Sequence, residues 1–212
     1  MPILDEKTKT EVKKILSPMQ DVVTLKLFTQ PFECGYCKDT HLLLDELAEL
    51  NPKLKIEVNQ FDTDIDEVSK HRIDKIPAIA IVGSKDYGIR FYGIPAGYEF
   101  SSLLNAILMV STGIVKLAEE TKAWLSKLDK PVHLQVFVTP TCPYCPPAVI
   151  LAHALAYYSD KVSADMVEIS EFPHLANKYS VQGVPRTVIN ESFYQEGAAP
   201  EAMLVAKIKE SL

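Results

Sequence analysis

The chain contains four cysteines, and they form two pairs of the same spacing, Cys34-Gly35-Tyr36-Cys37 and Cys142-Pro143-Tyr144-Cys145. A disulfide inside either pair closes a very small ring, so it hardly restricts the unfolded chain and adds little stability. Secreted disulfide scaffolds instead place their cysteines so that distant loops are joined. The pattern therefore indicates thiol–disulfide exchange or metal binding.

Zinc binding is the alternative to redox chemistry at these cysteines. Four thiolates from two C-x-x-C pairs can hold zinc, but structural zinc sites usually place such pairs about 15 to 20 residues apart. Here Cys37 and Cys142 lie in different halves of the chain. The spacing favours redox chemistry, and we expect no metal and no cofactor beyond redox-active disulfides.

The cysteine pairs belong to a sequence that repeats. The offset in residue number between Cys34 and Cys142 also separates Ile76-Pro77 from Val184-Pro185, so the two dipeptides align without a gap. A fixed period is the signature of a duplicated unit. A small-residue break at residues 111–113 separates the copies. The expected domains are residues 1–112, which contain Cys34 and Cys37, and residues 113–212, which contain Cys142 and Cys145.

Both units show the same order of predicted elements. A helix comes first, over residues 12–19 or 114–128, and a β-rich run follows, over residues 22–28 or 132–138. The cysteine pair, a helix, a strand, a short helix, the proline, two further strands and a last helix complete the unit. This alternation predicts an α/β fold with helices on both faces of a central mixed sheet.

The position of each pair assigns roles to its cysteines. Cys34 and Cys142 are predicted to follow a strand and open a helix, where unpaired N–H groups and the helix dipole favour a thiolate. They are the expected attacking thiols, with Cys37 and Cys145 resolving the mixed disulfide. Glu33 places a negative charge beside Cys34, so Cys142 is expected to be the more acidic thiol.

The two prolines are candidate substrate-binding residues. Pro77 and Pro185 each come directly before a β run, at the same distance beyond the attacking cysteine. A cis bond there could aim the backbone at the cysteines. The expected substrate-binding residues are the proline loops and the tyrosines inside the motifs: Ile76, Pro77, Val184, Pro185, Tyr36 and Tyr144.

Charge and hydropathy exclude other classes of function. The chain has 28 acidic and 22 basic residues, for a formal net charge of -6, so it lacks the basic excess that nucleic-acid binding requires. Hydrophobic residues make up 47% of the chain, but no apolar run is long enough to span a membrane. The beginning of the sequence does not read as a leader peptide. We therefore expect a cytoplasmic protein without a nucleic-acid or membrane partner.

These motifs resemble a known family. Each unit is similar to a thioredoxin-fold domain of glutaredoxin type, and the tandem chain resembles the protein disulfide oxidoreductases of hyperthermophilic archaea and bacteria. The resemblance is carried by Arg72-Ile73-Asp74 before Pro77, by Gly93-Ile94-Pro95-Ala96-Gly97, and by the run from Phe137 to Pro146. It implies two units that share a continuous sheet, a thermophilic source, and the reduction, formation and isomerisation of disulfides in intracellular proteins.

The sequence also departs from the parent patterns, and two other functions stay open. Thioredoxins have a buried acid six residues before the first cysteine, but Phe28 and Val136 occupy that position here. The first alternative is an electron carrier that a thioredoxin reductase reduces and that supplies peroxiredoxins. The second is a zinc-binding or holdase module.

Overall fold

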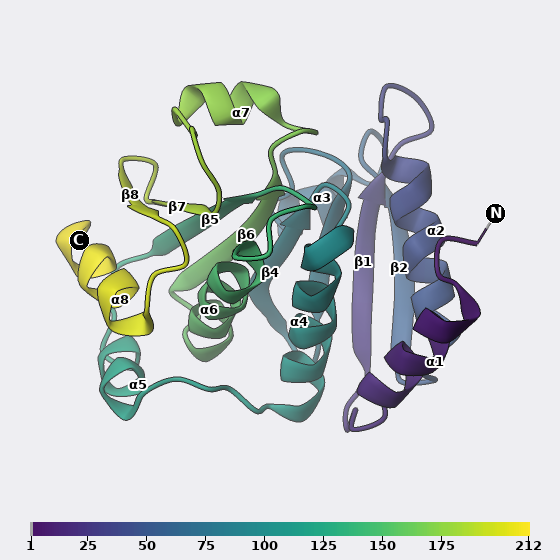
Figure 1. The fold of residues 1–212 in the computed structure, drawn as a ribbon, viewed down its shortest axis with the longest axis horizontal. Helices are drawn as coiled ribbons and strands as arrows, with labels where there is room; N and C mark the ends of the chain where they lie inside the picture. The colour runs from purple at the N-terminus through teal and green to yellow at the C-terminus, as the bar shows by residue number, and fades with distance from the viewer. Residues whose placement is uncertain (1) are drawn as a thin grey trace.

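A continuous sheet of eight strands forms the centre of the molecule, in the order β2-β1-β3-β4-β6-β5-β7-β8 (Figure 1). The computed structural model describes residues 2–212. The first half contains α1 (Glu6–Ile15), β1 (Val23–Thr29), α2 (Cys37–Ala48), β2 (Leu54–Gln60), α3 (Ile65–Lys70), β3 (Ala78–Val82), β4 (Asp86–Tyr92), the 3-10 helix η1 (Gly97–Glu99) and α4 (Phe100–Thr112). The second half contains α5 (Glu119–Leu125), β5 (Val132–Val138), α6 (Cys145–Tyr158), β6 (Val162–Glu168), α7 (Pro173–Lys178), β7 (Arg186–Ile189), β8 (Phe193–Glu196) and α8 (Glu201–Glu210).

The two halves of the chain join through the pairing of β4 with β6. These strands run parallel, with a register from Ile89↔Ala164 to Tyr92↔Val167. Gly88 permits the close approach at the start of this pairing, because a Cβ there would lie 3.1 Å from the carbonyl oxygen of Val162, and its φ of +72° disfavours other residues. The predicted mixed sheet that continues through both units is confirmed.

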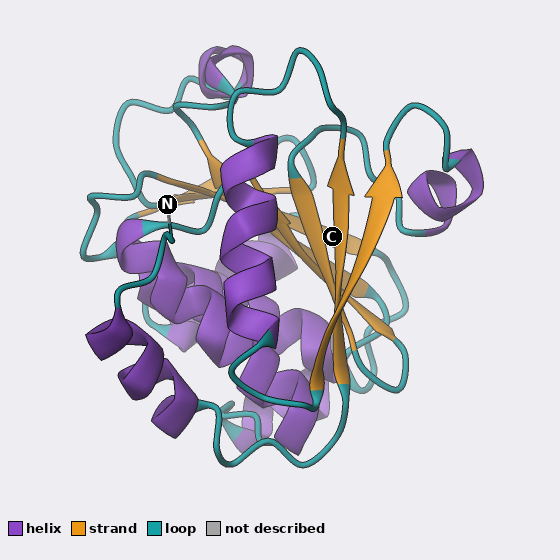
Figure 2. Ribbon diagram, turned by 90° about the vertical axis from the view of Figure 1, so that its right-hand side faces the viewer, coloured by secondary structure: helices purple, strands orange, loops and turns teal. Residues whose placement is uncertain are grey.

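Two apolar layers hold the helices on the sheet. The larger layer lies under α1, α2, α4, α5, α6 and α8, which share one face, and the smaller layer lies under α3 and α7 on the other face (Figure 2). Both faces of the central strands are therefore covered. This explains why β1 and β5 are buried along almost their whole length, although their sequences include the polar residues Lys26 and Gln135.

Helix α6 is more enclosed than α2. It packs on β4, β5 and β6 and also against α4, whereas α2 packs on the outer strands β1 and β2. The sequence of α6 is correspondingly apolar, with nine buried residues over its 14 positions. The duplicated helix that follows the second cysteine pair has thus become an interior element of the molecule.

The structure differs from the sequence prediction at the beginning of the second half. Residues 114–118 are not helical, and α5 covers only Glu119–Leu125 of the predicted 114–128. Gly113 adopts a left-handed conformation (φ 71°) and ends α4, after which the chain runs extended. The side chain of Ile114 is 66% exposed, while Val115 and Leu117 pack on the core. The apolar spacing there reflects this packing and not a longer helix.

Candidate active site

The sheet places both cysteine pairs on the same edge. β1 is antiparallel to β3, and β3 is antiparallel to β4, while β4, β6 and β5 are mutually parallel. β1 and β5 therefore run in the same direction, and their carboxyl ends meet one edge of the sheet. Each of these strands leads into a cysteine pair. We name Cys34, Cys37 and the Pro77 loop site one, and Cys142, Cys145 and the Pro185 loop site two.

Both pairs are closed as disulfides within their own motif. The sulfur atoms of Cys34 and Cys37 are 2.01 Å apart, and those of Cys142 and Cys145 are 2.20 Å apart. The Cα atoms of each pair are separated by 5.5 Å. All four cysteines are thus paired in the oxidised form of a dithiol centre.

The second cysteine of each pair is the less accessible one. Cys37 is 3% exposed and Cys145 is fully buried, whereas Cys34 is half-buried and Cys142 is 8% exposed. Helices α2 and α6 begin at the second cysteines, although the sequence pattern predicted that they begin at the first. The first cysteines therefore lie about one turn before the helix, where free N–H groups still face them.

Pro143 also lies outside the helix. It precedes α6, whose first turn instead contains Pro146 and Pro147. These prolines fit there because the first turn of a helix has no carbonyl partner for its N–H groups. The stiffness that the sequence attributed to Pro143 therefore belongs to the loop that carries Cys142.

The predicted proline loops share their geometry, and the loop of site two lies beside Cys142. The peptide bonds Ile76–Pro77 and Val184–Pro185 are both cis. The carbonyl oxygen of Val184 lies 3.7 Å from the sulfur of Cys142. The two loops are held in the same way, since the N–H of Gly93 donates to the Pro77 carbonyl (2.9 Å) and that of Gly197 to the Pro185 carbonyl (2.8 Å).

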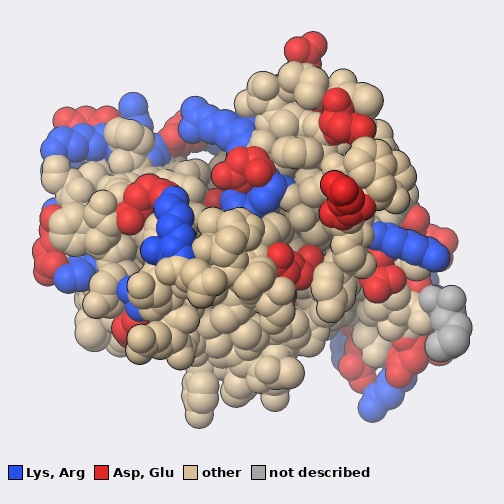
Figure 3. Space-filling model, turned by 90° about the horizontal axis from the view of Figure 1, so that it is seen from above, with Lys and Arg blue, Asp and Glu red and all other residues tan. Residues whose placement is uncertain are grey.

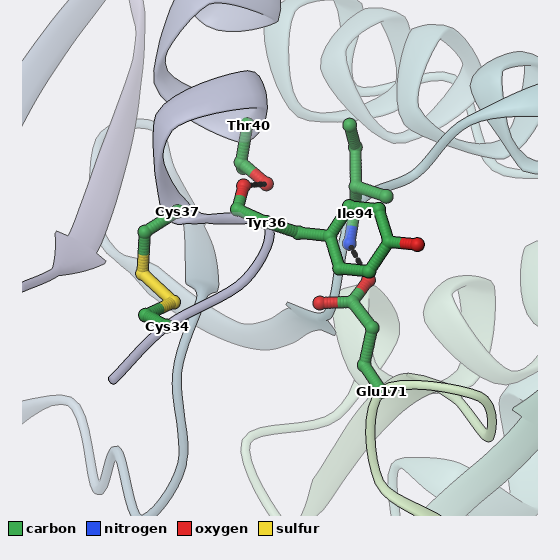
Figure 4. The surroundings of a disulfide bond; sticks show 6 residues. All are labelled: Cys34, Tyr36, Cys37, Thr40, Ile94 and Glu171. Atoms are coloured by element: carbon green, nitrogen blue, oxygen red, sulfur yellow. Dashed lines mark hydrogen bonds between the residues drawn. A yellow bond between two sulfur atoms is a disulfide. The ribbon is translucent and has the colours of Figure 1, made fainter. Parts of the chain in front are cut away.

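The two motif tyrosines are exposed and surround the sites. Tyr144 is 72% exposed and Tyr36 is 47% exposed. Figure 4 shows the Tyr36 ring pointing away from the first disulfide, toward Ile94 and Glu171. Both side chains are thus available to a molecule that binds along this edge of the sheet.

Glu99 is a buried acid near site two that the sequence pattern did not reveal. It is 2% exposed, and within residues 2–212 neither carboxylate oxygen has a hydrogen-bond partner. Burial raises the pKa of Glu99 to about 7. A glutamate at the start of a helix is common in any sequence, so its burial could not have been recognised.

Contacts between the two halves bring the segment that contains Glu99 close to site two. Glu99 ends η1, which packs against α6, the helix that begins at Cys145. In the same segment the N–H of Tyr98 donates to the carbonyl of Pro140 (3.0 Å), two residues before Cys142. A segment of the first half of the chain therefore lies against the part of the second half that carries site two. Val136, where thioredoxins have their buried acid, is apolar and fully buried here.

Metal clusters and membrane-spanning helices were the other kinds of feature that the sequence left to be checked. Among residues 2–212, no group of three or more His, Cys, Asp or Glu side chains is arranged to hold a metal ion. Within the same range, no helix has the length and apolar character to cross a membrane. On the face seen in Figure 3, basic and acidic side chains alternate rather than gather in a single patch.

Comparison with known proteins defines the class of the chain. A family model described as Thioredoxin domain matches residues 132–210. The NTD_N/C domain of alkylhydroperoxide reductase AhpF from Enterococcus faecalis superposes with a TM-score of 0.90, at 26% identity over 97% of this chain and 99% of that one. The fold and the two disulfides thus define a thioredoxin-fold dithiol–disulfide oxidoreductase with two redox centres.

A second structure identifies the family. A protein disulfide oxidoreductase from Aeropyrum pernix k1 superposes with a TM-score of 0.93, at 32% identity over 99% of this chain and 94% of that one. The chain belongs to the protein disulfide oxidoreductase family, as its motifs predicted.

The curated relatives are longer than this chain. An NADH dehydrogenase of Bacillus subtilis is 24% identical over 208 residues, which are 97% of this chain but 38% of that protein. The AhpF protein of the alkyl hydroperoxide reductase of Staphylococcus aureus is 23% identical over 172 residues, which are 81% of this chain and 31% of that protein. This chain therefore corresponds to less than half of either protein.

Proposed function

We propose that the protein reduces, forms and isomerises disulfide bonds in other proteins through sites one and two. The observation that carries this proposal is the pair of disulfides on one edge of the sheet, each in a motif that follows a central strand. Protein thiols and disulfides are the substrates, because an open edge with exposed tyrosines accepts an extended chain more readily than an enclosed small-molecule pocket would.

The chemistry follows from the different accessibility of the two cysteines. In the reducing direction, the thiolate of Cys34 or Cys142 attacks one sulfur of a substrate disulfide, and one substrate thiolate leaves. The second cysteine, Cys37 or Cys145, then loses its proton and attacks the first sulfur. The enzyme disulfide forms, the second substrate thiolate leaves, and two electrons have passed to the substrate. Oxidation is the same sequence in reverse.

Glu99 is the proton acceptor at site two. Cys145 is fully buried, so its thiol cannot lose a proton directly to water. A carboxyl whose pKa lies at about 7 exchanges protons at neutral pH with little free-energy cost. Among residues 2–212 neither oxygen of Glu99 has a hydrogen-bond partner, which leaves both for this exchange.

The proline loops and the motif tyrosines bind the substrate. The backbone groups of Ile76 and Val184 would pair with an extended segment, in the manner of an added strand. Pro77 and Pro185 set the direction of these loops, and Tyr36 and Tyr144 cover the flanks of the bound chain.

A second function is that of an electron carrier. The similarity to the AhpF proteins of alkyl hydroperoxide reductases and to the NADH dehydrogenase supports it. In this role a flavin-dependent reductase such as thioredoxin reductase would reduce the disulfides, and a peroxiredoxin would receive the electrons. We also propose that residues 1–112 and 113–212 are the two domains, that the protein acts in the cytoplasm of a thermophile, and that it needs no further cofactor.

Reduction of insulin by dithiothreitol tests the proposed function. The wild type should accelerate the precipitation of insulin chains, and a variant with Cys34→Ser and Cys142→Ser should not. Full activity of that variant would contradict the proposal, whereas a wild type that delays precipitation would favour the holdase alternative. Metal analysis of the reduced protein tests the zinc alternative, and consumption of peroxide in the presence of NADPH, thioredoxin reductase and a peroxiredoxin tests the carrier function.

A further inference from the structure

Glu171 belongs to the second half of the chain but contacts the surroundings of site one. It is half-buried in the segment that follows β6. Its carboxylate oxygen Oε1 accepts the backbone N–H of Ile94 at 2.7 Å, and Ile94 follows β4 in the first half. Figure 4 shows this contact on the side of the first disulfide toward which Tyr36 points.

The backbone next to this contact holds the proline loop of site one. The N–H of Gly93 donates to the carbonyl of Pro77 at 2.9 Å. Gly93 has a φ of +87°, and a Cβ there would lie 2.7 Å from Oε1 of Glu171 and 2.8 Å from the Cβ of Glu168. The glycine thus lets the carboxylate approach the same backbone that fixes the Pro77 loop.

Glu171 is itself held in place. Its backbone N–H donates to the carboxylate of Glu168 at 2.8 Å. Burial raises the pKa of Glu171 to about 7, the Ile94 N–H lowers it, and the charge of Glu168 raises it. The bond to Ile94 therefore stabilises the ionised carboxyl in a half-buried place, where a hydrogen bond to a charged group contributes more than one in water.

Site two has the proline-loop bond without the carboxylate. The N–H of Gly197 donates to the Pro185 carbonyl at 2.8 Å, as Gly93 does to Pro77. The next residue is Ala198, and among the described residues nothing lies within 4 Å of a Cβ built on Gly197. The added support is therefore a feature of site one.

We propose that Glu171 is a positioning residue for site one. Its carboxylate holds the Gly93-Ile94 backbone, so that the Pro77 loop presents Ile76 to an extended substrate segment. This inference rests on the proposed function, because it assigns Glu171 to substrate binding in the exchange reaction. Glu171 does not act on the sulfurs, so its loss should weaken substrate binding and leave the chemical step intact.

Kinetics of each site in the full-length chain test this proposal. Site one is isolated by Cys142→Ser with Cys145→Ser, and site two by Cys34→Ser with Cys37→Ser. In the chain that retains site one, we expect Glu171→Ala to raise the KM for insulin about fivefold and to change kcat less than about twofold. Glu171→Gln should restore the KM, because its amide oxygen still accepts the Ile94 N–H. Glu210→Ala, at an exposed carboxylate of α8, is the matched control.

The chain that retains site two should show no change in KM with Glu171→Ala. An unchanged KM at site one, or an equal rise at both sites, would overturn the proposal. Amide hydrogen exchange gives a second measurement that needs no activity. Glu171→Ala should accelerate exchange of the Ile94 N–H about tenfold or more, and Glu171→Gln should not. Absence of turnover in the chain with site one alone would count against the proposed function, while unaltered exchange at Ile94 would count against the positioning role.

Discussion

Site one lies at the start of α2, which covers the outer strands of the sheet, whereas site two lies at the start of α6, between the sheet and α4. Helices α2 and α6 both begin at the second cysteine of a motif, but only α6 is enclosed, because it lies next to the β4–β6 pairing. As a result Cys142 is 8% exposed while Cys34 is half-buried. The two sites thus share the cysteine spacing but differ in the surroundings in which it works.

Each site also has an acidic residue from the opposite half of the chain near it. Site two receives the buried acid Glu99 from the first half, and site one receives Glu171 from the second half at its proline loop. In the proposed mechanism Glu99 acts on proton transfer at site two, whereas Glu171 acts on substrate binding at site one. We therefore expect the two sites to differ in the step that limits each of them.

The largest effect should come from removal of the attacking cysteines one at a time. Cys142→Ser should lower the rate of insulin reduction about a hundredfold, since site two alone has a buried proton acceptor, and Cys34→Ser should lower it less than about threefold. Turbidity of precipitating insulin chains measures both rates. The comparison fails if Cys34→Ser causes the larger loss.

The segment between the sites should be far less tolerant of a methyl group than the first motif. Gly93→Ala adds a Cβ at a φ of +87° and 2.8 Å from the Cβ of Glu168, so we expect it to lower the free energy of unfolding by about 3 kcal/mol. Gly35→Ala is the control, because nothing lies within 4 Å of its Cβ. Urea unfolding of both variants measures the difference, and equal stability would show that the loop yields to the added methyl group.

Removal of the buried acid should slow site two and stabilise the fold. The pKa of Glu99 rises from 4.5 to about 7 on folding, so the folded state binds the proton more tightly and stability falls as the pH rises through that range. Glu99→Gln should therefore raise the free energy of unfolding at pH 8 by about 3 kcal/mol and leave it nearly unchanged at pH 4.

The same substitution should lower the exchange rate of site two about a hundredfold at neutral pH. It should leave the rate of site one, measured with Cys142→Ser and Cys145→Ser, unchanged. Insulin reduction and urea unfolding together separate a proton acceptor from a residue that only packs. A variant that is more stable but fully active at site two would remove Glu99 from the proposed mechanism.

The sequence was sufficient to predict what depends on local pattern and on the repeat. The cysteine pairing, the α/β order of elements and the strand over residues 132–138 follow from spacing and periodicity, and the structure has β5 at Val132–Val138. The error at residues 114–118 has the same source, because apolar spacing does not distinguish a helix from an extended segment that packs on the core.

Contacts between the two halves could not be predicted in this way. Glu99 reads as an ordinary acidic residue before a helix, and Glu171 as an ordinary acid before Pro173. Their significance comes from the β4–β6 pairing, which brings η1 to α6 and Ile94 to Glu171. Only a three-dimensional arrangement shows that these two acids have become buried or half-buried beside redox sites.

The smallest expected difference between α6 and α2 is in the pH dependence of stability, and it concerns His153 of α6. This ring is 1% exposed and meets Phe91 edge-on at a centroid distance of 4.9 Å. Burial lowers the pKa of His153 from 6.5 to about 4, so the unfolded state binds the proton more tightly. The contribution of neutral His153 to the free energy of unfolding is therefore fully present above pH 6.5 and is lost as the pH falls toward 4. At pH 5.5 the loss should be about 1 kcal/mol. The corresponding position of α2 is Asp45, which is exposed, so α2 carries no such group.

His153→Leu should remove this part of the acid sensitivity. The difference in unfolding free energy between pH 7.5 and pH 5.5, measured in urea, should shrink by about 1 kcal/mol relative to the wild type. Comparison of two pH values within each variant cancels the change in packing that the substitution itself causes. An unchanged difference would mean that His153 reaches water before the molecule unfolds, and α6 would then be no better enclosed than α2. Because enclosure of α6 is what buries Cys145, that result would also weaken the case for a dedicated proton acceptor at site two.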